Sequence, residues 1–437
     1  MTYALMAVIF VLGYAAIALE HPLKVDKAAA ALFTAVACWV LFITGSSTIL
    51  HVTVEEARHM VEGNLLHHLG EIGGILFFLL GAMTIVELID AHQGFALITD
   101  KIKTTQKSSL LIFLSILAFF MSAALDNLTT SIVMATLLRK LIADKEDLWL
   151  FAGVIIIAAN AGGAWSPIGD VTTIMLWIGG QVTAGNIVLQ LLLPSLVCLL
   201  VPLFIATRRL KGEIVSPAQG SSEVEENKIP RQEQKLVLYV GVGALLFVPI
   251  FKSLTHLPPF LGILFGLSIL WGLTDLLHRN KAPQFREALS IGKIIERVDT
   301  PSILFFLGIL LAVGALQSAG HLGQIAAFLD NRVGDIWIIN LVIGLLSAVV
   351  DNVPLVAGAM GMYELGTYPQ DHLFWELLAY CAGTGGSVLI IGSAAGVAIM
   401  GILKIDFIWY LRNIASLALM GYLSGALTFY LLKLLLG

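Results

Sequence analysis

The sequence places the polar stretch SAALDNLTT (residues 122–130) in the middle of the apolar run 108–140. The same pattern, Ser-Ala-x-x-Asp-Asn, returns in SAVVDNVPL (347–355), in the middle of the run 336–366. A single Asp–Asn pair can be explained as the cap of a turn, because both side chains hydrogen-bond to nearby backbone. Two such pairs about half a chain apart, each interrupting an apolar run, favour a functional site instead.

The composition indicates a membrane protein. Hydrophobic residues make up 58% of the chain and charged residues 13%, against roughly 45–50% and 25% in soluble domains. The mean hydropathy is +0.91, and apolar runs long enough to cross a bilayer recur from end to end. The three cysteines all lie inside such runs, where we expect them to pack rather than to form a disulfide or bind a metal.

The apolar segments with the length of a regular transmembrane helix are 3–20, 28–45, 72–90, 188–206, 236–252, 259–277, 301–317 and 407–432. The first has no basic stretch before it and no clear cleavage site after it, so we expect a retained helix. The amphipathic segments 52–69 and 283–298 are better suited to the membrane interface. The polar stretch 208–235 is expected to be a linker between two halves, 1–207 and 236–437.

Four further runs are too irregular to be simple spans. The runs 108–140 and 336–366 carry their polar motifs at the centre, and we expect each to fold back as a re-entrant hairpin. The runs 148–180 and 373–403 are interrupted by NAGGAWSPIGD and GTGGSVLIIGS. We expect two broken transmembrane helices there, since irregular backbone inside a membrane is tolerated only where protein or a water-filled cavity surrounds it.

The distribution of basic residues supports the two hairpins. With both runs folded back, 21 of the 25 Lys and Arg residues fall on one side, and the other side keeps Arg58, Lys252, Arg332 and Lys433. Basic loops remain cytoplasmic, so the linker is expected in the cytoplasm and both termini outside. If the first run crossed once, neighbouring basic clusters would lie on opposite faces.

The two halves align with each other. The segment ILFFL at 75–79 returns at 303–307, and Gly162 returns as Gly385. The first half begins outside and the second inside, so the two would have opposite topologies. Inverted repeats whose discontinuous helices meet near the midplane are typical of secondary transporters. The predicted fold is therefore an all-α polytopic membrane protein with two inverted-topology repeats, each containing a re-entrant hairpin and a broken transmembrane helix.

Polar side chains at the hairpin tips and helix breaks would meet inside the membrane. Three of them are carboxylates, Asp126, Asp170 and Asp351. No Lys or Arg falls within 108–138, 148–180, 336–366 or 373–403, so we expect no basic partner. Oxygen ligands without thiols or imidazoles favour a hard cation such as Na+ or Li+. The candidate cation and proton ligands are Ser122, Asp126, Asn127, Asn160, Asp170, Thr172, Thr173, Ser347, Asp351, Asn352, Thr384 and Ser387. Those expected to hold the metal ion directly are Asp126, Asn127, Asp170, Asp351 and Asn352.

The chemistry of these ligands narrows the function. Desolvation and neighbouring like charges favour the protonated form of a carboxylate, so Na+ and H+ would compete for the same oxygens, as in an exchanger. An anion carrier for arsenite or a dicarboxylate is the alternative, and a channel with acidic rings fits the inverted hairpins less well. No phosphate-binding glycine loop is visible. We therefore expect a carrier and not an enzyme, with no cofactor and no nucleic-acid partner.

Three stretches carry a family resemblance. MSAALDNLTTSIVMATLLRK, NAGGAWSPIGDVTTIMLW and SAVVDNVPLVAGAMGMY resemble the NhaD-type sodium/proton antiporters of the ion transporter superfamily, whose relatives include arsenite permeases and dicarboxylate carriers. The resemblance implies exchange of Na+ or Li+ for H+ in a bacterial inner membrane. It also implies a homodimer in which a transport region moves against a scaffold, as in an elevator. Every polar position of the family's motifs is kept here.

Overall fold

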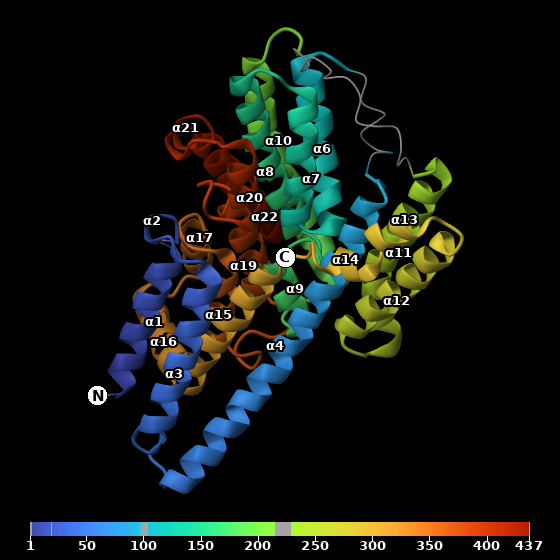
Figure 1. The fold of residues 1–437 in the computed structure, drawn as a ribbon. Coiled ribbons are helices and arrows are strands. Elements are labelled where there is room, and N and C mark those ends of the chain that lie inside the picture. The colour runs from blue at the N-terminus through green and yellow to red at the C-terminus, as the bar shows by residue number, and fades with distance from the viewer. Residues whose placement is uncertain (1, 19, 96, 98–103, 215–228, 437) are drawn as a thin grey trace.

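The chain folds almost entirely into helices (Figure 1). The structure, a computed structural model, describes residues 2–18, 20–95, 97, 104–214 and 229–436. Within these ranges nine helices are long and apolar enough to cross a membrane, so the expected all-α polytopic membrane protein is confirmed. Residues 215–228 of the predicted linker lie outside the described ranges.

The helices follow the predicted order of spans and breaks. The first half contains α1 (Thr2–Ala18), α2 (Glu20–Leu23), α3 (Lys27–Leu50), α4 (Val54–Ala91), α6 (Lys107–Leu125), α7 (Asn127–Leu141), α8 (Lys145–Ala164), α9 (Val171–Ile178) and α10 (Ala184–Arg209). The second half contains α11 (Arg231–Thr255), α12 (Pro259–His278), α13 (Pro283–Ala288), α14 (Ile291–Ile295), α15 (Thr300–Ser318), α16 (His321–Arg332), α17 (Ile336–Leu346), α18 (Asn352–Met362), α19 (Leu373–Gly385), α20 (Ala394–Leu403), α21 (Phe407–Asn413) and α22 (Ala415–Leu436).

The course of α4 corrects one prediction. The sequence predicts an interfacial segment at 52–69 separate from the span 72–90, but both belong to one helix of 38 residues. Thr53 begins this helix with a reciprocal capping box to Glu56, and no proline interrupts it downstream. At 1.5 Å per residue α4 extends over about 57 Å, well beyond a hydrocarbon core of about 30 Å. Its charged N-terminal half therefore projects, beside α3, past the other helices (Figure 1).

The C-terminal region is more segmented than predicted. The run 407–432, expected as one span, forms α21 and α22 with a break at Ile414, and α21 turns by 118° from α20. Tyr410 of α21 is buried and donates to the carbonyl oxygen of Ser387 (2.7 Å), so contact with the helix break holds α21 in its bent course. Helix α16 was not predicted either, because its twelve residues mix polar and apolar side chains.

The irregular runs 108–140 and 336–366 each form two helices that fold back. Lys107 at the start of α6 pairs with Asp147 at the start of α8 (2.6 Å), so α7 returns to the end at which α6 began. Tyr363, after α18, donates to Asp330 at the end of α16 (3.0 Å), which returns α18 to the start of α17. By its length alone α6 could cross a membrane, so the re-entrant course remains a prediction.

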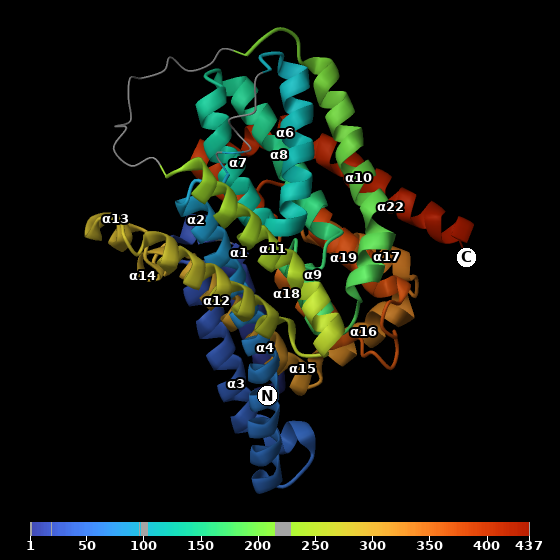
Figure 2. The ribbon, with the colours of Figure 1, turned by 90° about the vertical axis from the view of Figure 1, so that its right-hand side faces the viewer.

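Packing partners recur in corresponding positions of the two halves. α1 packs on α3 as α11 packs on α12, and α3 lies against α15 as α12 lies against α4. α6 packs along α8 as α17 packs along α19, while α7 contacts α20 and α18 contacts α9. α10 and α22, the last long helices of the two halves, pack on each other (Figure 2). The returning helix of each pair, α7 or α18, is thus held by the broken helix of the other half.

The broken helices occupy the centre of the molecule, where α8 and α19 are buried along almost their whole length. Glycines allow their close approach to the neighbouring helices. A Cβ atom on Gly162 would lie 2.2 Å from the carbonyl oxygen of Phe119, and one on Gly385 would lie 1.9 Å from that of Gly344. A glycine on the broken helix therefore allows the close packing of α6 on α8 and of α17 on α19.

Candidate functional site

Four short helices begin at a polar N-cap. Asp126, Asp170 and Asp351 each accept a hydrogen bond from a backbone N–H at the start of α7, α9 and α18. Ser393 does the same for α20. Capping is therefore one role of each aspartate. A helix N-terminus carries partial positive charge. At three of these four N-termini, an aspartate carboxylate lies against that charge.

Asp170 lies at the centre of a buried polar network. Its side chain is 1% exposed and accepts from the backbone N–H and the hydroxyl of Thr172 (2.8 and 2.6 Å). Asn127, at the tip of the first hairpin, donates to one carboxylate oxygen (2.5 Å). Asn352, at the tip of the second, points its amide at both oxygens (3.4 and 3.5 Å). The two hairpin tips therefore meet at one carboxylate.

Asn160 connects this carboxylate network to the second half. It is fully buried, accepts from Asn127 (3.1 Å) and donates to the hydroxyls of Ser387 and Ser393 (both 2.9 Å). Ser393 stands in the second half where Asp170 stands in the first. The polar centre is consequently asymmetric, with a carboxylate on one side of Asn160 and hydroxyls on the other.

Two serines of the candidate set attach the hairpins to the broken helices. Ser122 donates to the carbonyl oxygen of Ala159 (2.5 Å), and Ser347 donates to that of Ala382 (3.0 Å). The two bonds are equivalent in the aligned halves. Since both hydroxyl protons are engaged with backbone, these serines position the hairpin tips.

Two threonines of the candidate set bond within their own helices. Thr173 donates to the carbonyl oxygen of Asp170 (2.9 Å), and Thr384 donates to that of Tyr380 (2.6 Å). Both side chains are buried. Thr173 thereby supports the backbone of the Asp170 cap, whereas Thr384 stabilises the last turns of α19.

Asp126 holds the first hairpin turn in an unusual backbone conformation. Its φ is +86° and its ψ is 161°, a region that residues other than glycine rarely enter and that costs on the order of 1–3 kcal/mol. Its carboxylate accepts from the backbone N–H and the hydroxyl of Thr129 (2.7 and 3.0 Å). Asp351 adopts an ordinary φ of −48°. Backbone strain of this kind is typical of functional sites.

Asp351 has a basic partner, so the expectation of an acidic centre without one is wrong. The ammonium of Lys27, the first residue of α3, lies 3.6 Å from Asp351 Oδ2 and 4.6 Å from the ring centre of Phe305 on α15. The two charged side chains are 24% and 16% exposed. Sequence reasoning missed this pair because a lysine before an apolar span usually anchors the helix at the interface. The pair forms because α3 packs on α15, which in turn contacts α18 of the second hairpin.

Glu376 is a buried acid that was not predicted from the sequence. It is 1% exposed, pairs with Lys433 of α22 (2.6 Å) and accepts from Asn186 of α10 (2.5 Å). It ties three helices together from the first turn of α19, at the opposite end from the helix break. A lone carboxylate in the apolar stretch LFWELL is a signal that could have identified it, because buried carboxylates are rarely unpaired.

Comparison with known proteins identifies the family. The family model described as citrate transporter matches residues 14–376. The chain is 48% identical to Sodium/proton antiporter 1 of Arabidopsis thaliana over 420 residues, which cover 96% of this chain and 71% of that protein. It is 46% identical to Sodium/proton antiporter 2 of the same plant, over 97% and 98% of the two chains. Identity to the Na(+)/H(+) antiporter NhaD of Vibrio cholerae is 32%, over 97% and 91%. The chain therefore belongs to the NhaD-type sodium/proton antiporters.

Proposed function

We propose that this protein is a secondary carrier that exchanges Na+ or Li+ for H+ across a membrane. The observation that carries the proposal is the buried carboxylate of Asp170, which receives amides from both hairpin tips. Asp126 and Asp351 belong to the same two tips. The names of the relatives, sodium/proton antiporters, support Na+ and H+ as the transported ions, and membership of a transporter family supports a carrier rather than an enzyme.

The direct ligands of the cation would be oxygens of the hairpin tips and the first helix break. Asp170 has two hydrogen-bond donors from Thr172 and two from the hairpin amides, an arrangement that suits an ionised carboxylate, which can only accept. An incoming cation would recruit the carbonyl oxygens of Asn127 and Asn352 by turning their amide groups. A proton on Asp170 would replace the cation, so that the two ions are bound alternately.

An anion carrier is the second candidate, because the matching family model is described as citrate transporter. Two observations weigh against it. Three of the four helix N-termini in the centre are capped by aspartate, and Lys27 is engaged with Asp351. An anion would therefore enter a centre whose positive groups already have acidic partners, at a large desolvation cost.

The recurring packing of the two halves supports inverted repeats with re-entrant hairpins. In this arrangement the hairpins and broken helices would move as a transport region against a scaffold that contains α3, α4, α12 and α15. We expect an elevator-like carrier that assembles as a homodimer in a bacterial inner membrane, with the linker cytoplasmic and both termini outside. Surrounding lipid would cover the many exposed apolar side chains of the outer helices.

A reconstitution assay tests the transported ion. Proteoliposomes that carry an acid interior and a pH-sensitive dye would receive Na+, Li+, K+, citrate, succinate or arsenite in turn. We expect Na+ and Li+ to collapse the proton gradient and the other additions to leave it intact. If an anion collapses the proton gradient and Na+ does not, the protein is an anion carrier and the exchange of Na+ for H+ is refuted.

A further inference from the structure

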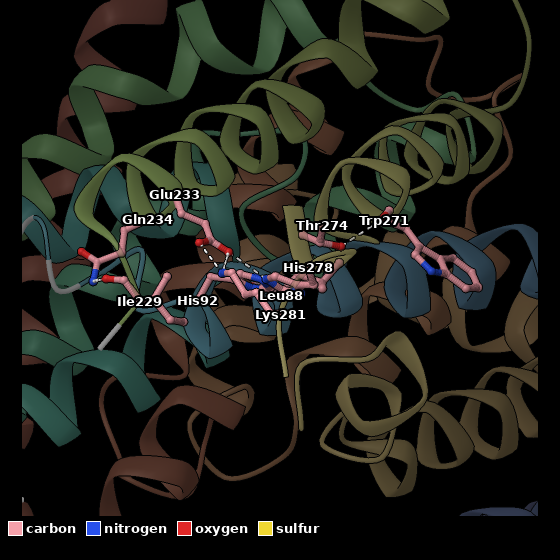
Figure 3. A network of polar contacts seen from close by, with 9 residues as sticks. All are labelled: Leu88, His92, Ile229, Glu233, Gln234, Trp271, Thr274, His278 and Lys281. Atoms are coloured by element: carbon pink, nitrogen blue, oxygen red, sulfur yellow. Dashed lines mark hydrogen bonds and ion pairs between the residues drawn. The ribbon is translucent and has the colours of Figure 1, made fainter. Parts of the chain in front are cut away.

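A second polar cluster lies away from the transport site, where the end of α4 meets the start of α11 and the end of α12 (Figure 3). It consists of His92, Glu233 and His278, one from each element, and all three are at most 7% exposed. One potential ligand atom of each lies within 4.8 Å of the other two. Two imidazoles and one carboxylate are a ligand set that suits zinc, with water as the fourth ligand.

His92 is prepared as a metal ligand. Its Nδ1 lies 2.7 Å from the carbonyl oxygen of Leu88, so this nitrogen carries the proton and Nε2 presents a lone pair. Nε2 is buried and has no hydrogen-bond partner among the described residues. A backbone carbonyl that fixes the tautomer of a histidine is the usual support of a metal-ligating imidazole.

Lys281 competes with a metal ion for the carboxylate. Its ammonium lies against both oxygens of Glu233, and His278 Nε2 lies 2.8 Å from one of them. The side chain of Lys281 is 25% exposed and borders the ring of Phe285 (4.6 Å), so the ammonium can leave toward solvent. Binding of a divalent ion would release this ammonium from Glu233 and leave the proton of His278 on Nδ1.

From this geometry we propose that His92, Glu233 and His278 bind a divalent transition-metal ion, with Zn2+ as the natural occupant. The bound ion would cross-link α4, α11 and α12. Of these, α4 and α12 belong to the scaffold of the proposed carrier, and the metal site is independent of which ion is transported. Lys281 holds the place of the metal when none is bound, so that metal affinity is set by the competition between the two cations.

The test uses the purified full-length protein with any affinity tag removed. Titration with Co2+ should give the visible absorption of one tetrahedral ion per chain, and Zn2+ should displace it. Glu233→Gln and His92→Gln should each abolish that absorption. The matched control is His67→Gln, because His67 is exposed and pairs with Glu71 at the surface. This variant should bind the metal as the wild type does.

The Lys281→Met variant distinguishes a metal site from a purely structural ion pair, because it removes the ammonium and keeps all three metal ligands. Without metal it should lower Tm, because Glu233 is left buried and unpaired. Zn2+ should restore Tm, and the affinity for Zn2+ should rise about tenfold or more as the competing charge is removed. The proposal is overturned if neither the wild type nor Lys281→Met binds one Co2+ or Zn2+ per chain. It is also overturned if Glu233→Gln and His92→Gln bind the metal as tightly as the wild type.

Discussion

Replacement of Lys27 by glutamine tests whether this lysine occupies the place of the transported cation at Asp351. The ammonium and the carboxylate are 3.6 Å apart. Two unit charges about 4 Å apart attract by about 1 kcal/mol in water and about 4 kcal/mol at the effective dielectric constant near a protein surface. Both side chains are partly exposed, so the lower part of this range applies. If the loss of the Lys27 charge makes Na+ binding more favourable by about 1.4 kcal/mol, the affinity for Na+ rises about tenfold.

We therefore expect Lys27→Gln to lower the Na+ concentration that gives half-maximal exchange by about tenfold. The assay is Na+-induced dequenching in proteoliposomes at alkaline pH, where protons compete least. Lys27→Arg keeps the charge and should leave the half-saturation close to that of the wild type. Lys24→Gln is the matched control, because Lys24 is exposed in the connection that precedes α3. An unchanged or increased half-saturation in a well-folded Lys27→Gln protein would refute the competition argument.

Three further predictions concern the site and the topology. Asp126→Asn and Asp351→Asn should each reduce Na+-driven proton movement to the level of empty vesicles while the protein still inserts; near-normal exchange would remove that residue from the site. Asp170→Asn should also lose exchange, because the amide cannot bind and release a proton, whereas Asp170→Glu should retain it with weaker Na+ affinity; exchange by Asp170→Asn with unchanged pH dependence would make Asp170 a structural cap. Cysteines at the exposed positions Ala143 and Thr367, in a background without native cysteines, should be labelled from the cytoplasm and from outside, respectively; labelling from one common face would contradict the inverted hairpins.

Much of the architecture could be predicted because the sequence marks it with polar and glycine interruptions of apolar runs. Asp126 and Asp351 interrupt two such runs, and each lies at the turn between two helices. The glycines of NAGGAWSPIGD and GTGGSVLIIGS mark the two helix breaks. The continuity of α4 could not be predicted from its charged first half, because charge shows where a helix meets water and not where it ends.

The contacts between distant segments could not be predicted from the sequence for a different reason. Lys27 and Asp351 are 324 positions apart in the chain, and they come together because α3 packs on α15, which contacts α18. The cluster of His92, Glu233 and His278 depends in the same way on three helix ends meeting. No local pattern distinguishes these residues from ordinary interfacial side chains, since a charged residue at a helix end is usually solvated.

The asymmetry of the polar centre bears on how many cations it binds. Two perfectly repeated halves would offer two equivalent carboxylates, one at each helix break. Here both hairpin amides, those of Asn127 and Asn352, turn toward Asp170, while the equivalent Ser393 receives the amide of Asn160. The second break therefore contributes hydroxyl oxygens without charge. In the proposed exchanger, the two halves would therefore build one cation site at the first break, to which the second half contributes the tip that carries Asn352.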